Sequence, residues 1–96
     1  MKIELQKFGT TLLSRQTGRE AYSAFLPTLN ALSENEIIEV DFNGVITFSP
    51  SWGDEFLSKL LEKYGDKLVL MKSNNPSVLA TIEILEQVNN MKFKIV

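Results

Sequence analysis

The stretch from Asp41 to Ser51 holds the residues best suited to chemistry in this chain. It contains Thr47, Ser49 and Ser51, and it leads into a helix that we expect to begin at Ser51, with Asp54 three residues later. The first N–H groups of a helix have no partner within the helix, and the helix dipole favours negative charge there. Such a place suits an anion or a phosphorylated side chain. Spacing alone favours the simpler interpretation, in which the Ser51 hydroxyl is an N-cap that satisfies one backbone N–H.

Three other residues near this junction have two interpretations each. Trp52 follows Ser51 on an apolar helical stripe, where tryptophan is usually core, although its place at the helix start allows partial exposure for a partner. Arg15 precedes the first expected helix and is either a solvated charge, the default for arginine, or an anchor for an anion. Asp41 ends an expected strand, but a receiver-type phosphoacceptor also needs an acidic pair after the first strand, which the sequence lacks.

The composition argues against several classes of function. The chain has no cysteine and no histidine, which removes thiolate nucleophiles, the common zinc ligands and the usual proton shuttle at neutral pH. Its five glycines are isolated and form no phosphate-binding loop. We find no nucleophile–base pair, and we therefore expect no enzyme activity, no cofactor and no metal. The net charge of −2, with scattered lysines and arginines, predicts no binding to nucleic acid.

The same sequence predicts one small cytoplasmic domain. Its 96 residues are enough for a single core. The first residues alternate in polarity and do not resemble a signal peptide. The longest apolar run, 68–71, has four residues, whereas a membrane-spanning helix needs about 20. We therefore expect no association with a membrane.

The positioning elements follow from hydrophobic periodicity. Alternating or continuous apolar runs predict strands over 2–8, 36–42, 67–71 and 91–96. Helical spacing predicts helices after Thr17, from 51 to 64, and from Pro76, which follows Asn75 and takes the first helical position. Strands that alternate with helices indicate right-handed crossovers. The expected fold is a single α/β domain with a four- to five-stranded, mostly parallel sheet and three helices.

Several local details can be tested against the structure. Thr17 and Glu20 fit a capping box, and Pro27 should kink or break the first helix. The run 67–71 is apolar throughout, as expected for a strand covered on both faces. The apolar stripe of the last helix is expected to comprise Val78, Leu79, Ile82, Leu85 and Val88.

Two segments of this sequence resemble a known family. Residues 39–45, Glu-Val-Asp-Phe-Asn-Gly-Val, and 48–56, Phe-Ser-Pro-Ser-Trp-Gly-Asp-Glu-Phe, resemble the central motif of the STAS-like family of small bacterial proteins, a domain of unknown function. Residues 12–15, Leu-Leu-Ser-Arg, with Gly18 and Arg19, are similar to its earlier segment. The resemblance implies a STAS-like fold.

The wider STAS superfamily includes the anti-sigma-factor antagonists. The resemblance implies binding to a serine kinase and phosphorylation of a serine at the start of the equivalent helix, the position that Ser51 occupies here. The antagonists have glycine after aspartate and serine, whereas this chain has Ser49, Pro50, Ser51 and a bulky Trp52; the STAS-like family itself usually has phenylalanine at the Trp52 position. Partner binding therefore carries over better than phosphorylation does.

Three hypotheses follow, with the oligomeric state open between a monomer and an edge-strand dimer. In the first, residues 47–54 contact a protein partner, a serine-kinase-like or other ATP-binding regulator. In the second, the same helix start, near Arg15, holds a small anion or nucleotide. The third, a hydrolase or transferase, has the least support because no catalytic pair is found.

Overall fold

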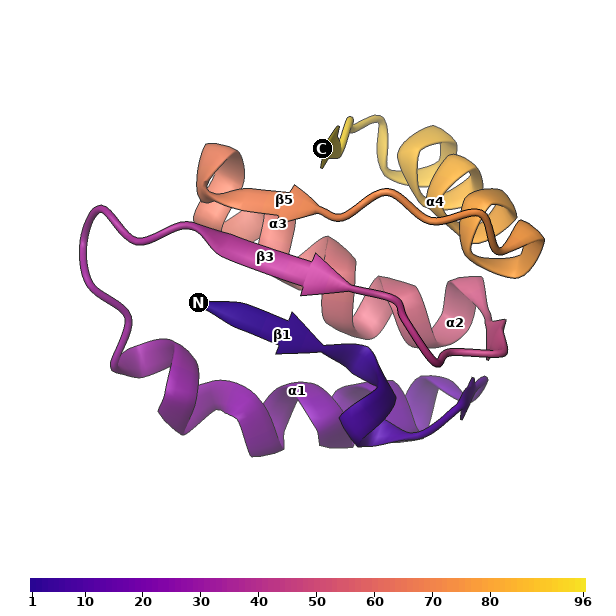
Figure 1. The fold of residues 1–96 in the computed structure, drawn as a ribbon, viewed down its shortest axis with the longest axis horizontal. Helices are drawn as coiled ribbons and strands as arrows, with labels where there is room; N and C mark the ends of the chain where they lie inside the picture. Colours follow the sequence, from indigo (N-terminus) through magenta and orange to yellow (C-terminus); the bar gives the residue numbers. More distant parts are fainter.

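The centre of the fold is a parallel four-stranded sheet. The computed structural model describes all of residues 1–96. Strands β1 (Lys2–Glu4), β3 (Ile38–Asp41), β5 (Leu68–Leu70) and β6 (Lys94–Ile95) lie side by side in that order, and every neighbouring pair is parallel (Figure 1). The predicted α/β domain with a mostly parallel sheet is confirmed.

Consecutive strands are neighbours in this sheet, so right-handed crossovers place the connecting helices on one face. The register confirms two unlike faces: Ile3 and Val40 pair on the buried face, whereas Lys2 and Glu39 pair on the other. No helix covers that second face, contrary to the expectation for the run 67–71. Val69 also lies on this second face and is nevertheless buried; its register partners on the neighbouring strands are Glu39 and Lys94.

The fold contains a second, two-stranded sheet that was not predicted from the sequence. Strands β2 (Thr11–Leu12) and β4 (Thr47–Phe48) pair in parallel, and the backbone N–H of Ser49 donates to the carbonyl of Leu12 at 2.9 Å. This sheet brings residues 9–14 alongside the segment 43–51, between the strand expected over 36–42 and the helix expected from 51, where no strand was predicted.

Helix α1 (Arg15–Asn30) begins three residues earlier than predicted. Its N-cap is Ser14, whose hydroxyl accepts from the Thr17 N–H at 3.1 Å, and the Thr17 hydroxyl bonds back to the Ser14 carbonyl. The predicted cap at Thr17 is therefore wrong. The break expected at Pro27 is also absent, because the carbonyl that loses its donor belongs to Ser23, which is exposed to water.

The helix after β4 is continuous but not uniform. It comprises α2 (Pro50–Gly53), a π-helical turn, η2 (Asp54–Ser58), and α3 (Lys59–Tyr64), and Gly65 ends it with a φ of 54°. Short 3₁₀ turns, η1 (Leu5–Phe8) and η3 (Gly65–Lys67), precede β2 and β5. The π turn has no signature in the apolar spacing, which predicted one regular helix.

Helix α4 (Pro76–Asn89) starts as predicted, with Asn75 as its cap and Pro76 at the first helical position. Its buried face differs from the prediction, because Leu79 and Val88 are exposed. The buried Thr81 faces inward instead, since its hydroxyl donates to the carbonyl of Phe48 at 2.6 Å. None of the helices combines the length and the apolar character needed to cross a membrane.

Candidate functional site

Three helices begin at one end of the molecule. In Figure 1 the strands β3 and β5 point toward the right-hand end, and α1, α2 and α4 all start there. Their caps are the side chains of Ser14, Ser49 and Asn75. The Asn75 amide also donates to the carbonyls of Val45 and Ile46, at 2.8 and 3.1 Å, which ties the start of α4 to the loop between β3 and β4.

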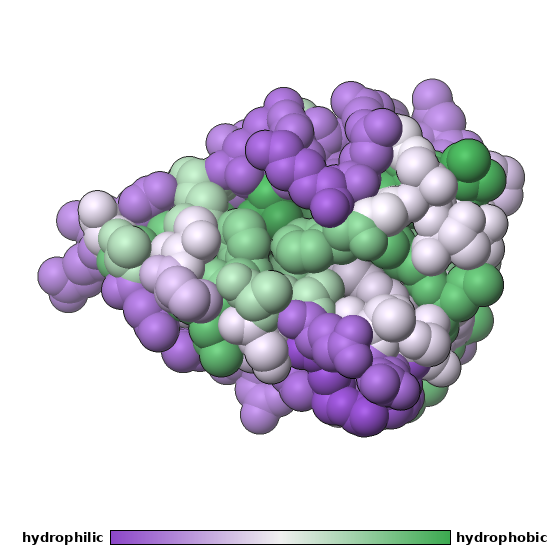
Figure 2. All heavy atoms as spheres, turned by 90° about the horizontal axis from the view of Figure 1, so that it is seen from below, coloured by the Kyte–Doolittle hydropathy of each residue, from purple (hydrophilic) through white to green (hydrophobic).

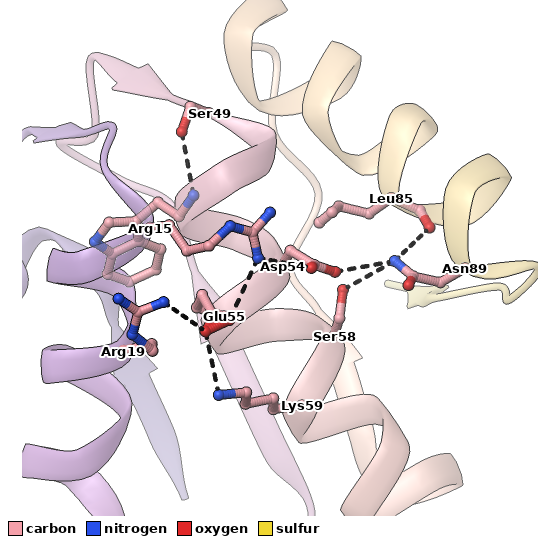
Figure 3. Close-up of polar contacts among 10 residues, drawn as sticks. Arg15, Arg19, Ser49, Asp54, Glu55, Ser58, Lys59, Leu85 and Asn89 are labelled. Atoms are coloured by element: carbon pink, nitrogen blue, oxygen red, sulfur yellow. Dashed lines mark hydrogen bonds and ion pairs between the residues drawn. The ribbon is translucent and has the colours of Figure 1, made fainter.

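Ser49, not Ser51, caps α2. The Ser49 hydroxyl accepts from the backbone N–H of Trp52 at 3.2 Å (Figure 3). It also donates to the carbonyl of Leu13. Proline is favoured at the first helical position, so Pro50 places the cap one residue before itself. The prediction that Ser51 is the N-cap is therefore wrong.

Ser51 is left with an uncommitted hydroxyl. It lies at the second position of α2, is half-buried, and forms no side-chain hydrogen bond in the structure. Thr47 is also half-buried, within β4. Of the two serines singled out in the sequence, only Ser51 is chemically free.

Trp52 belongs to the core. Only 1% of its surface is exposed, and its ring stacks on Phe56 with centroids 5.0 Å apart. Phe48 and Phe8 lie 5.8 and 6.1 Å from it, centroid to centroid. The partial exposure expected from its place at the helix start is wrong, so the faces of this ring cannot contact a partner.

An ion-pair network joins α1 to the π turn directly below α2 (Figure 3). Arg15 lies 3.1 Å from Asp54 and 3.4 Å from Glu55. Glu55, which is 8% exposed, also faces Arg19 at 3.7 Å and Lys59 at 3.3 Å. Arg15 is thus neither a lone solvated charge nor a free anchor for an anion, because two carboxylates already neutralise it.

Asp54 extends this network to α4. Asn89 donates to Asp54 at 3.1 Å and to the Leu85 carbonyl at 3.1 Å (Figure 3). Burial by itself would raise the pKa of Asp54, but hydrogen bonds from Arg15, Asn89 and Ser58 outweigh it and lower that pKa below its ordinary value. The hydrogen bond to Asp54 raises the pKa of Arg15 in turn. Asp54 therefore positions three helices, and its carboxylate is already committed to that role.

Gly18 lets α1 approach α2 closely, a role that was not predicted from the sequence. A Cβ at Gly18 would lie 2.8 Å from the Trp52 carbonyl oxygen, so only glycine fits this crossing without a shift. Its one signal in the sequence is a glycine inside an otherwise helical pattern.

The sequence also matches a family model. The model described as STAS-like domain of unknown function (DUF4325) matches residues 23–79, more than half of the chain. The chain belongs to this STAS-like family. The matched region includes β3, β4, Ser49, Ser51 and the π turn, whereas β2 and Arg15 precede it. No curated protein and no solved structure matches the chain at a significant level.

Proposed function

We propose that this STAS-like domain is a non-enzymatic regulatory module that binds a protein partner through the end where its helices start. The observation that carries the proposal is a group of large apolar side chains left exposed at this end: Ile46 is 67% exposed, Leu13 48% and Leu79 47%. Figure 2, viewed from below, shows strongly apolar atoms at the same right-hand end. Exposed apolar groups beside satisfied polar ones are typical of interaction surfaces.

The backbone that carries these three apolar side chains is held in place by the helix caps. The Ser49 hydroxyl bonds the carbonyl of Leu13, the Asn75 amide bonds that of Ile46, and Leu79 lies in the first turn of α4. A surface fixed by such bonds loses little conformational entropy when a partner binds. This supports direct protein recognition by an apolar surface that adjoins residues 47–54.

Family resemblance suggests the class of partner, a serine-kinase-like or other ATP-binding regulator. The uncommitted hydroxyl of Ser51 supports a phosphorylation-gated form of the proposal. A phosphate on Ser51 would add negative charge near the apolar surface and near Asp54. An apolar partner would then have to bury the phosphate at a desolvation cost, and the phosphate would repel the Asp54 carboxylate, so binding would weaken.

The alternative, an anion or nucleotide held near Arg15, is less well supported because Arg15 already faces Asp54 and Glu55. A ligand that binds the native state must raise its stability. We expect phosphate and ATP to leave the melting temperature unchanged. A clear rise with either would favour the alternative.

Affinity capture with matched variants tests the proposal. Ile46→Asp and Ser51→Glu should each abolish retention of a partner by the purified domain. Val88→Asp, at an equally exposed apolar site near the far end of α4, and Ser23→Glu, on an exposed face of α1, should retain it. Equal melting temperatures would confirm that all four fold. The same proteins retained by all four variants would contradict the proposal.

A further inference from the structure

We propose that the hollow between β2 and α1 binds an extended peptide segment of the partner, which adds to the free edge of β2 and accepts a hydrogen bond from the indole N–H of Trp52. The inference rests on the proposed function and states how part of the partner would be recognised. It depends on two independent features, an unpaired strand edge and the indole N–H of a nearly buried tryptophan that no protein group accepts from.

Of the two edges of the β2–β4 sheet, only the edge on β2 is free. On β4, the N–H and carbonyl of Phe48 are satisfied by α4: the Ser77 hydroxyl accepts from the N–H at 2.9 Å, and Ser77 and Thr81 donate to the carbonyl. On β2, the carbonyls of Thr10 and Leu12 face β4. Alternation along a strand therefore turns the N–H and carbonyl of Thr11 the other way. No protein group bonds them, and Thr11 is exposed.

The donor is the indole nitrogen of Trp52. This side chain is almost fully buried, yet no protein group accepts a hydrogen bond from its Nε1–H. The backbone N–H of Trp52, by contrast, donates to the Ser49 hydroxyl. No side-chain nitrogen or oxygen is completely buried without a partner, so the small exposed part of Trp52 must include Nε1. Buried tryptophans normally satisfy this group.

Both features open into one hollow of about 380 Å³ on the side of β2 away from β4. It is lined by Phe8, Thr11, Leu12, Thr17, Glu20, Ala21 and Trp52. Two donors, Trp52 Nε1–H and Thr11 N–H, and one acceptor, the Thr11 carbonyl, face a shared space. A peptide backbone, which presents carbonyl and N–H groups in turn, complements such a set.

The charge at the rim favours a peptide over an anion. Glu20 is exposed, and its carboxylate meets only the amide of Gln16, at 3.2 Å. A phosphate or nucleotide would be repelled by this carboxylate. A peptide with a lysine or arginine opposite Glu20 would instead gain an ion pair.

The test uses a random-peptide display library selected on the folded domain. Trp52 is the single tryptophan, so its indole ¹H–¹⁵N resonance is unique and reports on the hollow directly. Selected peptides should shift this resonance. Binding should weaken about tenfold in Trp52→Phe, which keeps an aromatic ring but lacks the N–H. It should weaken similarly in Thr11→Pro, which removes a backbone donor, and stay unchanged in Thr11→Ala, which keeps it.

Three outcomes would overturn the inference: no peptide enriched above background, selected peptides that leave the indole resonance unmoved, or equal affinity for Thr11→Pro and Thr11→Ala. Phosphate or ATP shifting the resonance would also overturn it, in favour of an anion site. A partner lost by Ile46→Asp but retained by Trp52→Phe and Thr11→Pro would leave the proposed function standing while the peptide mode fails.

Discussion

Gly18→Ala tests whether the helix starts depend on the close crossing of α1 and α2. The added Cβ would lie 2.8 Å from the Trp52 carbonyl oxygen, and 3.1 Å from both the Trp52 Cα and the Glu55 Cβ. Two of these three atoms are backbone, so relief requires one helix to move. Such a movement would also lengthen the contacts from Arg15 to Asp54 and Glu55.

The expected cost is a balance of two effects. Alanine in a helix interior is normally more stable than glycine by about 0.5–1 kcal/mol. Overpacking a tight contact typically costs about 1–3 kcal/mol. We therefore expect the free energy of unfolding to fall by about 1 kcal/mol, which lowers the melting temperature of a domain of this size by about 4–8 °C.

Thermal and urea unfolding, followed by circular dichroism, would measure this change. Ser23→Ala is the control, because Ser23 is exposed on the same helix and its replacement should alter stability by less than about 0.5 kcal/mol. Fluorescence of the single tryptophan would report a displaced ring environment. A melting temperature for Gly18→Ala at or above that of the wild type would refute the packing argument.

Three further predictions concern polar contacts and exposure. Thr81→Val should cost about 1 kcal/mol in urea unfolding, because it removes the 2.6 Å bond to Phe48 but leaves that carbonyl its second donor; no loss would show that the bond contributes nothing. The pKa of Asp54 is lowered on folding, so its contribution to stability is present above the unfolded pKa of about 3.9 and disappears as the pH falls through the folded pKa. Asp54→Asn should thus destabilise the domain at pH 7 and progressively less below pH 4; a difference independent of pH would contradict this. Leu79→Ser and Val88→Ser should each change stability by less than about 0.5 kcal/mol, and a larger loss in melting experiments would mean that these side chains are packed.

The sequence predicts the parts of this fold that local patterns specify. Alternation and apolar runs locate the strands of the main sheet, and the Asn75–Pro76 pair locates the start of α4, because a proline at the first helical position follows its cap. The same rule applied to Pro50 would have given Ser49 as the cap of α2. The error at Ser51 thus comes from a local signal that was present but not applied.

The remaining errors concern contacts between distant residues. Strands β2 and β4 have two residues each and pair across the whole of α1 and β3, so neither is long enough to show a period. Arg15 meets Asp54 only after the fold is formed, since 39 positions separate them in the sequence. Hydrophobic periodicity likewise cannot show that Thr81 faces the core in place of Leu79, because the reason is a hydrogen bond to another element.

The distribution of satisfied and unsatisfied groups supports recognition of a partner at this end of the domain. Catalysis usually requires several polar side chains that converge on one point and are free to react. Here Ser49, Asn75, Asp54 and Arg15 are committed to caps and ion pairs that hold the helix starts together. What stays free is of another kind: exposed apolar side chains, the hydroxyls of Thr47 and Ser51, one strand edge and one indole N–H. Under the proposed function, apolar area with a few directional donors would give affinity and orientation to a protein partner, and the caps would keep both in place before binding.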